Sequence, residues 1–422
     1  MNKSLNFTYP VMFLLSVILS GNIFAAEPAE MFQQTNEFKG VVVDSRSGDE
    51  IASAYLTVVG TNISTITNAD GEFSIKIPVT LSEATITISH LGYQSKTLPL
   101  SFFKAENTKV ELDEIAEQLS EISIYDGGDA QSLVKKMFEK KEANYTDEPI
   151  LMTAFYRETI KKGRRNVSLS EAVVKIYKAP YDSFAKDEIS LFKTRKTADY
   201  EKLDTLALKL RGGPYNTLYV DVIKYPQYLI DPDMLQNFKF NFDAPVRFDD
   251  RNLYVVNFEN NNKSIPWYYG KLFIDAETLS LVKATYNLNV DNRNMASQMF
   301  VRKKPRRATV YPIDVSYQVD YRQNDGKWQY GYGTANLVFV VNWKNKLFNS
   351  RYTVNGEMAV TNWETLPDFK IKKDDSFINP SVVMSDDVSG FTDVDFWGNN
   401  NIIEPEKSIQ NAIEKIKRQL QD

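Results

Sequence analysis

The stretch from residue 311 to residue 321 alternates between apolar and polar side chains, and this pattern constrains the fold more than any other. Successive side chains of a β-strand point to opposite faces, so one face of this strand is apolar and the other is polar. The motif Asn324-Asp325-Gly326 follows and favours a tight turn into a second strand at residues 328–341. We therefore expect an antiparallel sheet with one buried face and one wet face. The apolar positions are Tyr311, Ile313, Val315, Tyr317, Val319 and Tyr321, and the polar positions are Asp314, Ser316, Gln318 and Asp320.

Two more hairpins are predicted in the same part of the chain. One joins residues 153–160 to residues 169–177, and the other joins residues 269–274 to residues 281–288. Aromatic residues make up 13% of the sequence, with 23 Tyr and 25 Phe, and this enrichment favours strands over helices. We assign residues 149–365 to one antiparallel β domain with a curved sheet.

Residues 38–112 show a different pattern, of short alternating runs separated by turns that contain glycine. Within residues 73–77, the three apolar side chains fall on one face of a strand and the two polar ones on the other. About seven short strands at this spacing indicate a β-sandwich. The predicted fold class is therefore mainly β, with a seven-strand sandwich followed by a larger antiparallel sheet.

Three motifs of this first module carry a family resemblance. They are Gly-Val-Val-Val-Asp at residues 40–44, Thr-Asn-Ala-Asp-Gly-Glu-Phe at residues 67–73, and Ser-His-Leu-Gly-Tyr at residues 89–93. In this order and spacing they resemble the carboxypeptidase-regulatory-like (prealbumin-type) domain, which is common in Gram-negative exported proteins and at the front of TonB-dependent receptors. The resemblance implies a non-catalytic module. The chain departs from those receptors because it lacks a plug and a barrel.

Helices are predicted on both sides of the large β domain. A linker with an amphipathic helix occupies residues 113–148, and Asp129 is placed to cap that helix. The pattern of residues 199–210 also favours a helix, and we expect residues 366–422 to form a tail that ends in a helix. Pro405 falls in the first turn of this last helix. The apolar stripes of the first and last helices are Leu133, Val134, Met137 and Phe138, and Ile409, Ile413, Ile416 and Leu420.

The N-terminus is typical of a secretory signal peptide. Lys3 precedes an apolar core at residues 11–19, and residues 23–25 offer a cleavage site, so we expect residues 1–25 to be removed. The apolar core is shorter than the roughly 20 residues that span a bilayer. The chain contains no cysteine, so it can form no disulfide and carry no diacyl anchor. We expect an exported protein that is periplasmic, associated with the outer membrane or extracellular, and that is not an integral membrane protein.

The large β domain also has a faint resemblance to periplasmic lipoprotein-carrier proteins. A helix lies before a run of long hairpins, and residues 270–275 read Gly-Lys-Leu-Phe-Ile-Asp. The resemblance implies a curved antiparallel sheet around an apolar cavity. Aromatic side chains that could line such a cavity are Trp267, Tyr268, Tyr269 and Trp328. The alternative is that they belong to an ordinary packed core.

Two basic clusters stand out in a chain whose net charge is −5. They are consistent either with solvated loop tips or with contact to lipid phosphates or another anionic partner. The acidic average excludes nucleic acid as a favoured partner. The clusters are Lys161, Lys162, Arg164 and Arg165, and Arg302, Lys303, Lys304, Arg306 and Arg307.

Candidate catalytic and metal-binding residues are few. His90 is the only histidine, and with no cysteine the common zinc sites cannot be built, so we interpret it as a half-buried strand residue. Arg157, Glu158 and Glu171 could meet across a hairpin, most simply as an ion pair. Residues 393–404 have the outline of a calcium loop, but Trp397 occupies a ligand position, and Asx turns explain the segment better. We expect no cofactor, no bound metal and no catalytic residue.

These observations lead to one functional hypothesis and two alternatives. The first is a non-enzymatic exported envelope protein that binds an apolar or lipidated ligand, such as a lipid or a lipidated protein, in the larger β domain. The second is a structural adaptor whose β-sandwich docks on an outer-membrane assembly, and it predicts a fully packed sheet face. The third, and weakest, is a hydrolase that uses carboxylates.

Overall fold

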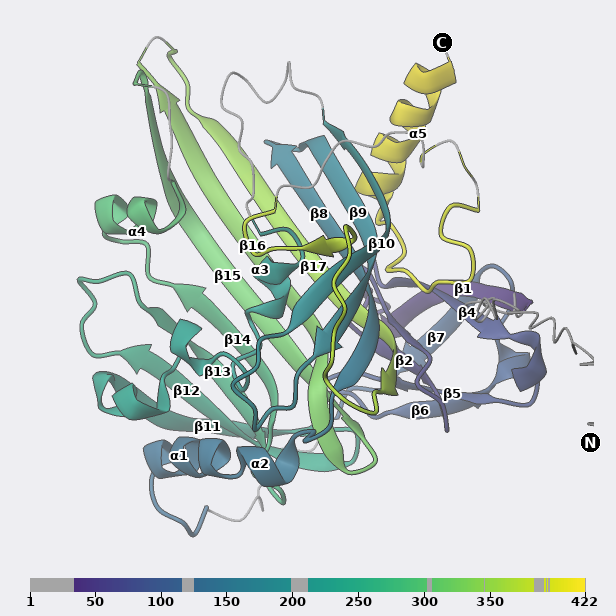
Figure 1. The fold of residues 1–422 in the computed structure, drawn as a ribbon, viewed down its shortest axis with the longest axis horizontal. Coiled ribbons are helices and arrows are strands. Elements are labelled where there is room, and N and C mark those ends of the chain that lie inside the picture. Colours follow the sequence, from purple (N-terminus) through teal and green to yellow (C-terminus); the bar gives the residue numbers. More distant parts are fainter. Residues whose placement is uncertain are drawn as a thin grey trace, which may run out of the picture. The chain divides into compact units, whose positions relative to one another are not determined.

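The N-terminal part of the described chain folds into two small β-sheets that share one core (Figure 1). The computed structural model describes residues 34–115, 125–198, 212–301, 306–344, 346–382, 391, 393 and 395–421. Buried side chains from both small sheets, including Val42 and Ile86, pack together, which confirms the predicted seven-strand sandwich. In sheet order the strands are β4 (Glu72–Pro78), β1 (Thr35–Asp44) and β7 (Thr108–Leu112), and β3 (Ser64–Ile66), β2 (Tyr55–Val58), β5 (Thr85–Ser89) and β6 (Lys96–Pro99), with short 3-10 turns η1 (Val79–Leu81) and η2 (Leu100–Phe102).

A second, much larger sheet has eleven strands among the described residues, and every neighbouring pair is antiparallel. This sheet confirms the predicted larger antiparallel sheet. The tail contributes the last edge strand, so the chain returns to the sheet after leaving it. In sheet order the strands are β11 (Phe238–Phe248), β12 (Arg251–Asn260), β13 (Tyr268–Asp275), β14 (Leu281–Leu288), β15 (Ala308–Asn324), β16 (Lys327–Trp343), β17 (Ser350–Thr365), β8 (Ile150–Lys162), β9 (Arg165–Lys178), β10 (Glu188–Ala198) and β18 (Phe377–Ile378).

All three predicted hairpins form. The longest joins β15 to β16, with Asn324 paired to Lys327 across a two-residue turn. Asp325 and Gly326, the two turn residues, have φ angles of 47° and 81°. Both lie in the left-handed region that a hairpin turn of this kind requires, and Asp and Gly tolerate it best.

The two faces of the large sheet are covered by different parts of the chain. We call them the cover face, which carries Tyr156 and Val174, and the sandwich face, which carries Arg157 and Glu171. The prediction that the polar face of β15 is wet is wrong at Asp320, which is 5% exposed. The β-sandwich lies over that position: the hydroxyl of Tyr55 donates to Asp320 at 3.1 Å, and Lys283 pairs with it at 3.2 Å.

The cover face is packed by the connector helix and by an irregular segment at residues 212–237, which we call the cover segment. Helix α1 (Ala130–Glu139) begins at Asp129, whose side chain accepts a hydrogen bond from the Ser132 amide, as predicted. Leu133 and Met137 of this helix are fully buried in the main core, so its stripe packs as expected. The remaining short elements here are α2 (Lys141–Asn144), α3 (Tyr215–Leu218), η3 (Pro226–Tyr228) and η4 (Pro232–Asn237).

Two further helices lie against the large sheet. Helix α4 (Arg293–Phe300) contacts β15, and its Phe300 ring meets Phe339 of β16 at 6.0 Å between centroids. Helix α5 (Lys407–Gln421) contacts β9, with Ile409 and Ile413 buried against Leu169. The predicted docking of the last helix on the sheet is therefore confirmed at these two positions.

Residues 34–422 group into one compact unit. Within the ranges that the structure describes, no helix is long and apolar enough to cross a membrane. Three predictions lie outside the described residues: the signal peptide at residues 1–25, the helix at residues 199–210, and the basic side chains of Arg302, Lys303 and Lys304.

Two glycines of the large sheet provide a matched test of its packing. A Cβ atom at Gly270 of β13 would overlap the carbonyl oxygen of Thr285 on the neighbouring strand, whereas at Gly356 of β17 the nearest atom is 3.6 Å away. We predict that Gly270→Ala lowers the free energy of unfolding by about 1–3 kcal/mol and that Gly356→Ala has little effect. Urea unfolding followed by tryptophan fluorescence measures both. Equal unfolding midpoints for the two variants would contradict the strand packing described here.

Candidate functional site

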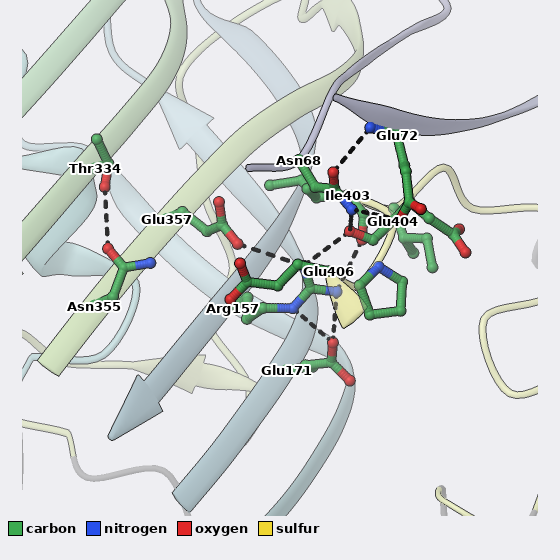
Figure 2. A network of polar contacts seen from close by, with 12 residues as sticks. Asn68, Glu72, Arg157, Glu171, Thr334, Asn355, Glu357, Ile403, Glu404 and Glu406 are labelled. Carbon is green, nitrogen blue, oxygen red and sulfur yellow. Dashed lines mark hydrogen bonds and ion pairs between the residues drawn. The ribbon is translucent and has the colours of Figure 1, made fainter. Parts of the chain in front are cut away.

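A buried arginine lies at the centre of the sandwich face (Figure 2). Arg157 of β8 and Glu171 of β9 stand directly opposite each other in the strand register. The Nε and Nη2 atoms of Arg157 both lie 2.8 Å from one oxygen of Glu171, and Nη1 lies 3.4 Å from Glu357 of β17. The predicted cross-strand ion pair is therefore present, and it is fully buried rather than exposed on a hairpin.

A second arginine completes this cluster. Arg195 of β10 approaches the other oxygen of Glu171, with Nη2 at 2.7 Å and Nε at 2.8 Å. Burial opposes the charge on Glu171, but the two guanidinium groups outweigh it and hold the pKa of this carboxyl below its ordinary value. We call Arg157, Glu171, Arg195 and Glu357 the arginine–glutamate cluster.

The tail of the chain is tied to this cluster. Arg157 donates to the carbonyl oxygens of Ile403, at 2.8 Å, and Glu404, at 3.4 Å (Figure 2). The Arg195 guanidinium stacks over the rings of Phe391 and Trp397, at 4.6 and 4.9 Å. Because neither arginine could remain buried without these partners, the tail is part of the site and not an appendage.

The tail also bonds to the β-sandwich. Asn68 donates to the Glu404 carbonyl at 3.1 Å, from the side of the tail opposite the large sheet (Figure 2). Asn401 accepts from the backbone amide of Lys76 at 2.6 Å and donates to the same residue's carbonyl at 3.3 Å. The stretch at residues 401–404 is therefore bonded to the sandwich and to the large sheet at once.

Direct contacts between the sandwich and the large sheet complete the arrangement. Arg322 of β15 donates to Thr57 at 2.6 Å and also to Ser64, and its guanidinium lies 5.4 Å from the Tyr55 ring centroid. Asn62 donates to the carbonyl of Trp363 at 2.6 Å. Burial lowers the pKa of Arg322 to about 10, so this side chain remains charged at neutral pH.

A second buried charge cluster lies on the cover face. Lys178 at the end of β9 donates to Asp187 and Asp221, both at 2.7 Å, and none of the three side chains reaches solvent. The hydroxyls of Tyr181 and Tyr321 each donate to Asp221 at 2.9 Å. Burial disfavours the charge on Lys178, but the two carboxylates outweigh it and raise the pKa of its ammonium group. Asp221 belongs to the cover segment, so this cluster fixes that segment to the sheet.

The carboxylates of this region each have a partner within the protein. Glu158 lies on the face opposite Glu171, where Tyr156 donates to it at 2.8 Å, and burial raises the pKa of its carboxyl. Glu171 is saturated by two arginines, and burial raises the pKa of Glu357 while Arg157 opposes that rise. These groups hold elements together, since each faces a protein partner.

His90 lies where the sandwich meets the large sheet. It is half-buried, as predicted, but it directly follows β5 and is not a strand residue. Its ring meets that of Tyr93 edge-on at 5.4 Å. Burial lowers the pKa of His90 to about 4, and the nearby charge of Lys283 acts in the same direction. His90 is therefore neutral at pH 7.

Two of the aromatic residues predicted to line a ligand site are neighbours on β13. The ring of Tyr268 packs against Tyr286 and Tyr317, with centroids 5.6 and 6.0 Å apart. Tyr269 is the next residue of the strand, so it points to the other face, and it is 47% exposed. Only Tyr268 of this pair belongs to a tyrosine cluster, which also contains Tyr286 and Tyr317.

The two predicted tryptophans lie elsewhere. Trp267 precedes β13 and packs on Phe238 of β11, at 5.6 Å between centroids. Trp328 begins β16 and is buried, with a backbone bridge to Tyr145 and the Arg251 guanidinium 5.4 Å from its ring. The four aromatic residues therefore do not converge on one location.

The predicted basic residues are at strand ends. Lys161 pairs with Glu406 at 3.1 Å, and the ammonium of Lys162 lies 5.8 Å from the Tyr352 ring centroid. The other described members of the clusters, which are all exposed, are Arg164, Arg165, Arg306 and Arg307.

The acidic segment near the C-terminus forms turns. Asp393 accepts from the amide of Asp395 at 3.0 Å, an Asx turn, and the Gly398 amide donates to the Asp395 carbonyl. Trp397 packs on Phe155, at 5.3 Å between centroids. In the described part of the chain, no group of three or more potential ligands is placed to hold a metal ion.

Several of the central residues carried no recognisable signal in the sequence. Arg195, Glu357 and Asp221 come from segments far from their partners, so spacing along the chain could not associate them. Lys178 is the exception, because it follows Ala172, Val174 and Ile176 on the apolar face of β9. A lysine there implies a buried carboxylate partner without identifying it.

The comparisons with known proteins agree with the sequence resemblance for the first module. Residues 38–124 match the family model of the CarboxypepD_reg-like domain. The comparison with curated proteins finds no match.

Solved structures with low similarity cover more of the chain. One is a putative outer membrane lipoprotein-sorting protein domain from Vibrio parahaemolyticus, with 9% identity and a TM-score of 0.25 over 56% of this chain and 92% of that one. A LolA superfamily protein from Nitrosomonas europaea has 9% identity and a TM-score of 0.20, over 57% and 96%. MucB in complex with MucA(peri) has 11% identity and a TM-score of 0.19, over 56% and 99%.

The arginine–glutamate cluster can be tested by removing its central cation. We predict that Arg157→Met lowers the free energy of unfolding by about 3–5 kcal/mol, because Glu171 and the carbonyls of residues 403 and 404 lose a buried partner. Urea unfolding gives the stability, and limited proteolysis shows whether the tail has become cleavable. Lys109→Met, which removes an exposed ion pair with Glu111, serves as the control and has little effect. Equal stability of the two variants would contradict the role given to Arg157.

The single histidine permits a clean pH experiment. Between its ordinary pKa and about pH 4, the unfolded chain binds a proton at His90 that the folded chain does not, so stability falls as pH falls through this window. We predict that His90→Gln loses less stability than the wild type between pH 7 and pH 5. Unfolding midpoints in urea at several pH values measure the difference. Parallel pH profiles would show that His90 titrates normally.

Proposed function

We propose that this chain is a non-enzymatic exported protein of the cell envelope that acts as an adaptor. The observation that carries the proposal is the joining of sandwich, sheet and tail through Arg157, Arg322 and residues 401–404. The buried arginines at two of these junctions, and the amide bonds of Asn68 and Asn401 at the third, favour one fixed arrangement of the modules over independent movement. A fixed arrangement suits a protein that presents surfaces to partners.

The packing of the cover face also supports the adaptor proposal. An adaptor is expected to have a filled sheet face, and the main core is filled by the chain's own side chains from α1, the cover segment and the sheet. Asp221 holds the cover segment in place through Lys178. The apolar face is therefore satisfied without a ligand in this region.

The absence of enzymatic activity is proposed on the basis of the carboxylates. A hydrolase needs two acids that face each other with room for substrate between them. Glu171 and Glu357 instead share the Arg157 guanidinium, and Glu158 points to the opposite face. The export signal in the sequence and the match of residues 38–124 to an accessory domain support placement in the envelope.

A second candidate, binding of an apolar or lipidated ligand, is favoured by one specific feature. The tyrosine cluster of Tyr268, Tyr286 and Tyr317 is only partly buried at two of its three members. Helix α4, which follows β14 in the chain, exposes Met295 and Met299 by 41% and 46%. Exposed methionines are common on surfaces that adapt to apolar partners.

Native mass spectrometry of the mature protein, purified from its own envelope, separates these candidates. The adaptor proposal predicts a bare chain mass, or the mass of a protein complex. A reproducible small added mass that is lost on denaturation would contradict it and support ligand binding. In that case Tyr268→Asp should remove the added mass, whereas Tyr269→Asp, on the other face of the same strand, should retain it.

A further inference from the structure

The ends of several central strands, distant in the sequence, meet at one end of the large sheet, the upper end in Figure 1. Ala308 at the start of β15 pairs with Trp343 at the end of β16, and Val341 pairs with Ser350 at the start of β17. The amide of Gly163, in the turn between β8 and β9, donates to the carbonyl of Arg351 at 2.9 Å. Three separate loops therefore lie side by side.

These loops carry a concentration of positive charge. Residues 160–168, 306–313 and 338–356 contain no Asp or Glu. We call the exposed basic side chains of these loops the basic edge: Arg164, Arg165, Arg306, Arg307, Lys344 and Arg351. Among the described residues, none of these six side chains forms an ion pair, whereas the neighbouring Lys161 does. The net charge of the whole chain is −5, so the basic edge is a region of positive charge on a protein whose overall charge is negative.

An apolar tip stands at the centre of the basic edge. Leu347 and Phe348, in the turn between β16 and β17, are 97% and 84% exposed. Exposing two large apolar side chains side by side is unfavourable in water, and their burial in an apolar phase would be favourable. Lys344 and Lys346 precede the tip in the same turn.

We propose that the basic edge docks on an anionic phospholipid surface. Leu347 and Phe348 enter the boundary between headgroups and acyl chains, and the arginines of the neighbouring loops contact lipid phosphates. A lipid surface fits better than an acidic protein, because it presents negative charge in a plane with an apolar phase directly beneath. The cations spread over three loops and the protruding apolar tip match that layered chemistry.

This inference goes beyond the proposed function and does not depend on it. An adaptor and a ligand carrier could both use a membrane-facing edge. Native mass spectrometry tests what the protein holds, whereas vesicle binding tests where it docks, so failure of one proposal leaves the other intact.

Vesicle co-sedimentation tests the docking directly. The mature protein is mixed with vesicles of phosphatidylcholine and phosphatidylglycerol, or of phosphatidylcholine alone, at low and high salt. We expect binding only to the anionic vesicles, with weakening at high salt. Each basic residue near an anionic surface strengthens association about fivefold, so Arg306→Glu/Arg307→Glu should weaken binding by at least about tenfold. Leu347→Ser/Phe348→Ser should weaken it by a similar factor.

A matched control exists in the loop after β9, at the opposite end of the sheet. Phe184 is fully exposed and Lys186 is exposed, so Phe184→Ser/Lys186→Glu removes the same kinds of side chain from the wrong place. This control should bind vesicles as the wild type does, and circular dichroism verifies that all variants are folded. Failure of the wild type to bind anionic vesicles would overturn the proposal and leave an acidic protein as the occupant. Equal binding by the control and the basic-edge variants would also overturn it.

Discussion

The burial of Arg157 is the constraint on which the rest of the structure depends. A guanidinium group keeps its charge even when it is removed from water, so every donor must find an acceptor inside the protein. Glu171 accepts two of these donors, and Glu357 and two tail carbonyls accept others. These partners come from β9, β17 and the tail, and the arginine therefore determines which elements must be present before this region can exclude water.

The two buried charge clusters hold different segments of the chain against the two faces of the large sheet. On one face, the arginine–glutamate cluster holds the tail against the sheet, and the tail holds the sandwich. On the other face, Lys178 and Asp221 hold the cover segment. Hydrophobic burial supplies most of the driving force, but it is not directional. The buried ion pairs specify which irregular segment occupies which position, a task that apolar contacts perform poorly.

Much of the architecture could be predicted from the sequence, because it rests on local patterns. The Asp325-Gly326 turn and the Asp129 cap act over a few residues, and both are present in the structure. The alternation predicted a strand at β15, and the strand is present, but register shifts next to Pro312 and Asp320 interrupt the predicted faces. The contact between Arg157 and Glu171 could also be predicted, since one hairpin turn fixes their register. Asp320 could not, because its burial depends on a sandwich that arrives from far away in the sequence. The same reason explains why Arg195, Glu357 and Asp221 carried no signal.

The bond between Lys76 and Asn401 joins residues separated by 325 positions. Contacts of such high sequence separation form slowly, because a long loop must close before they contribute. The strands of the sandwich all lie within residues 35–112, so the sandwich can assemble early. Its junction with the sheet also requires residues 401–404. Without residues 403 and 404, Arg157 lacks two of its acceptors, although Glu171 and Glu357 remain. The junction is therefore completed only when nearly the whole polypeptide is available, which places the last step of assembly at the end of the chain.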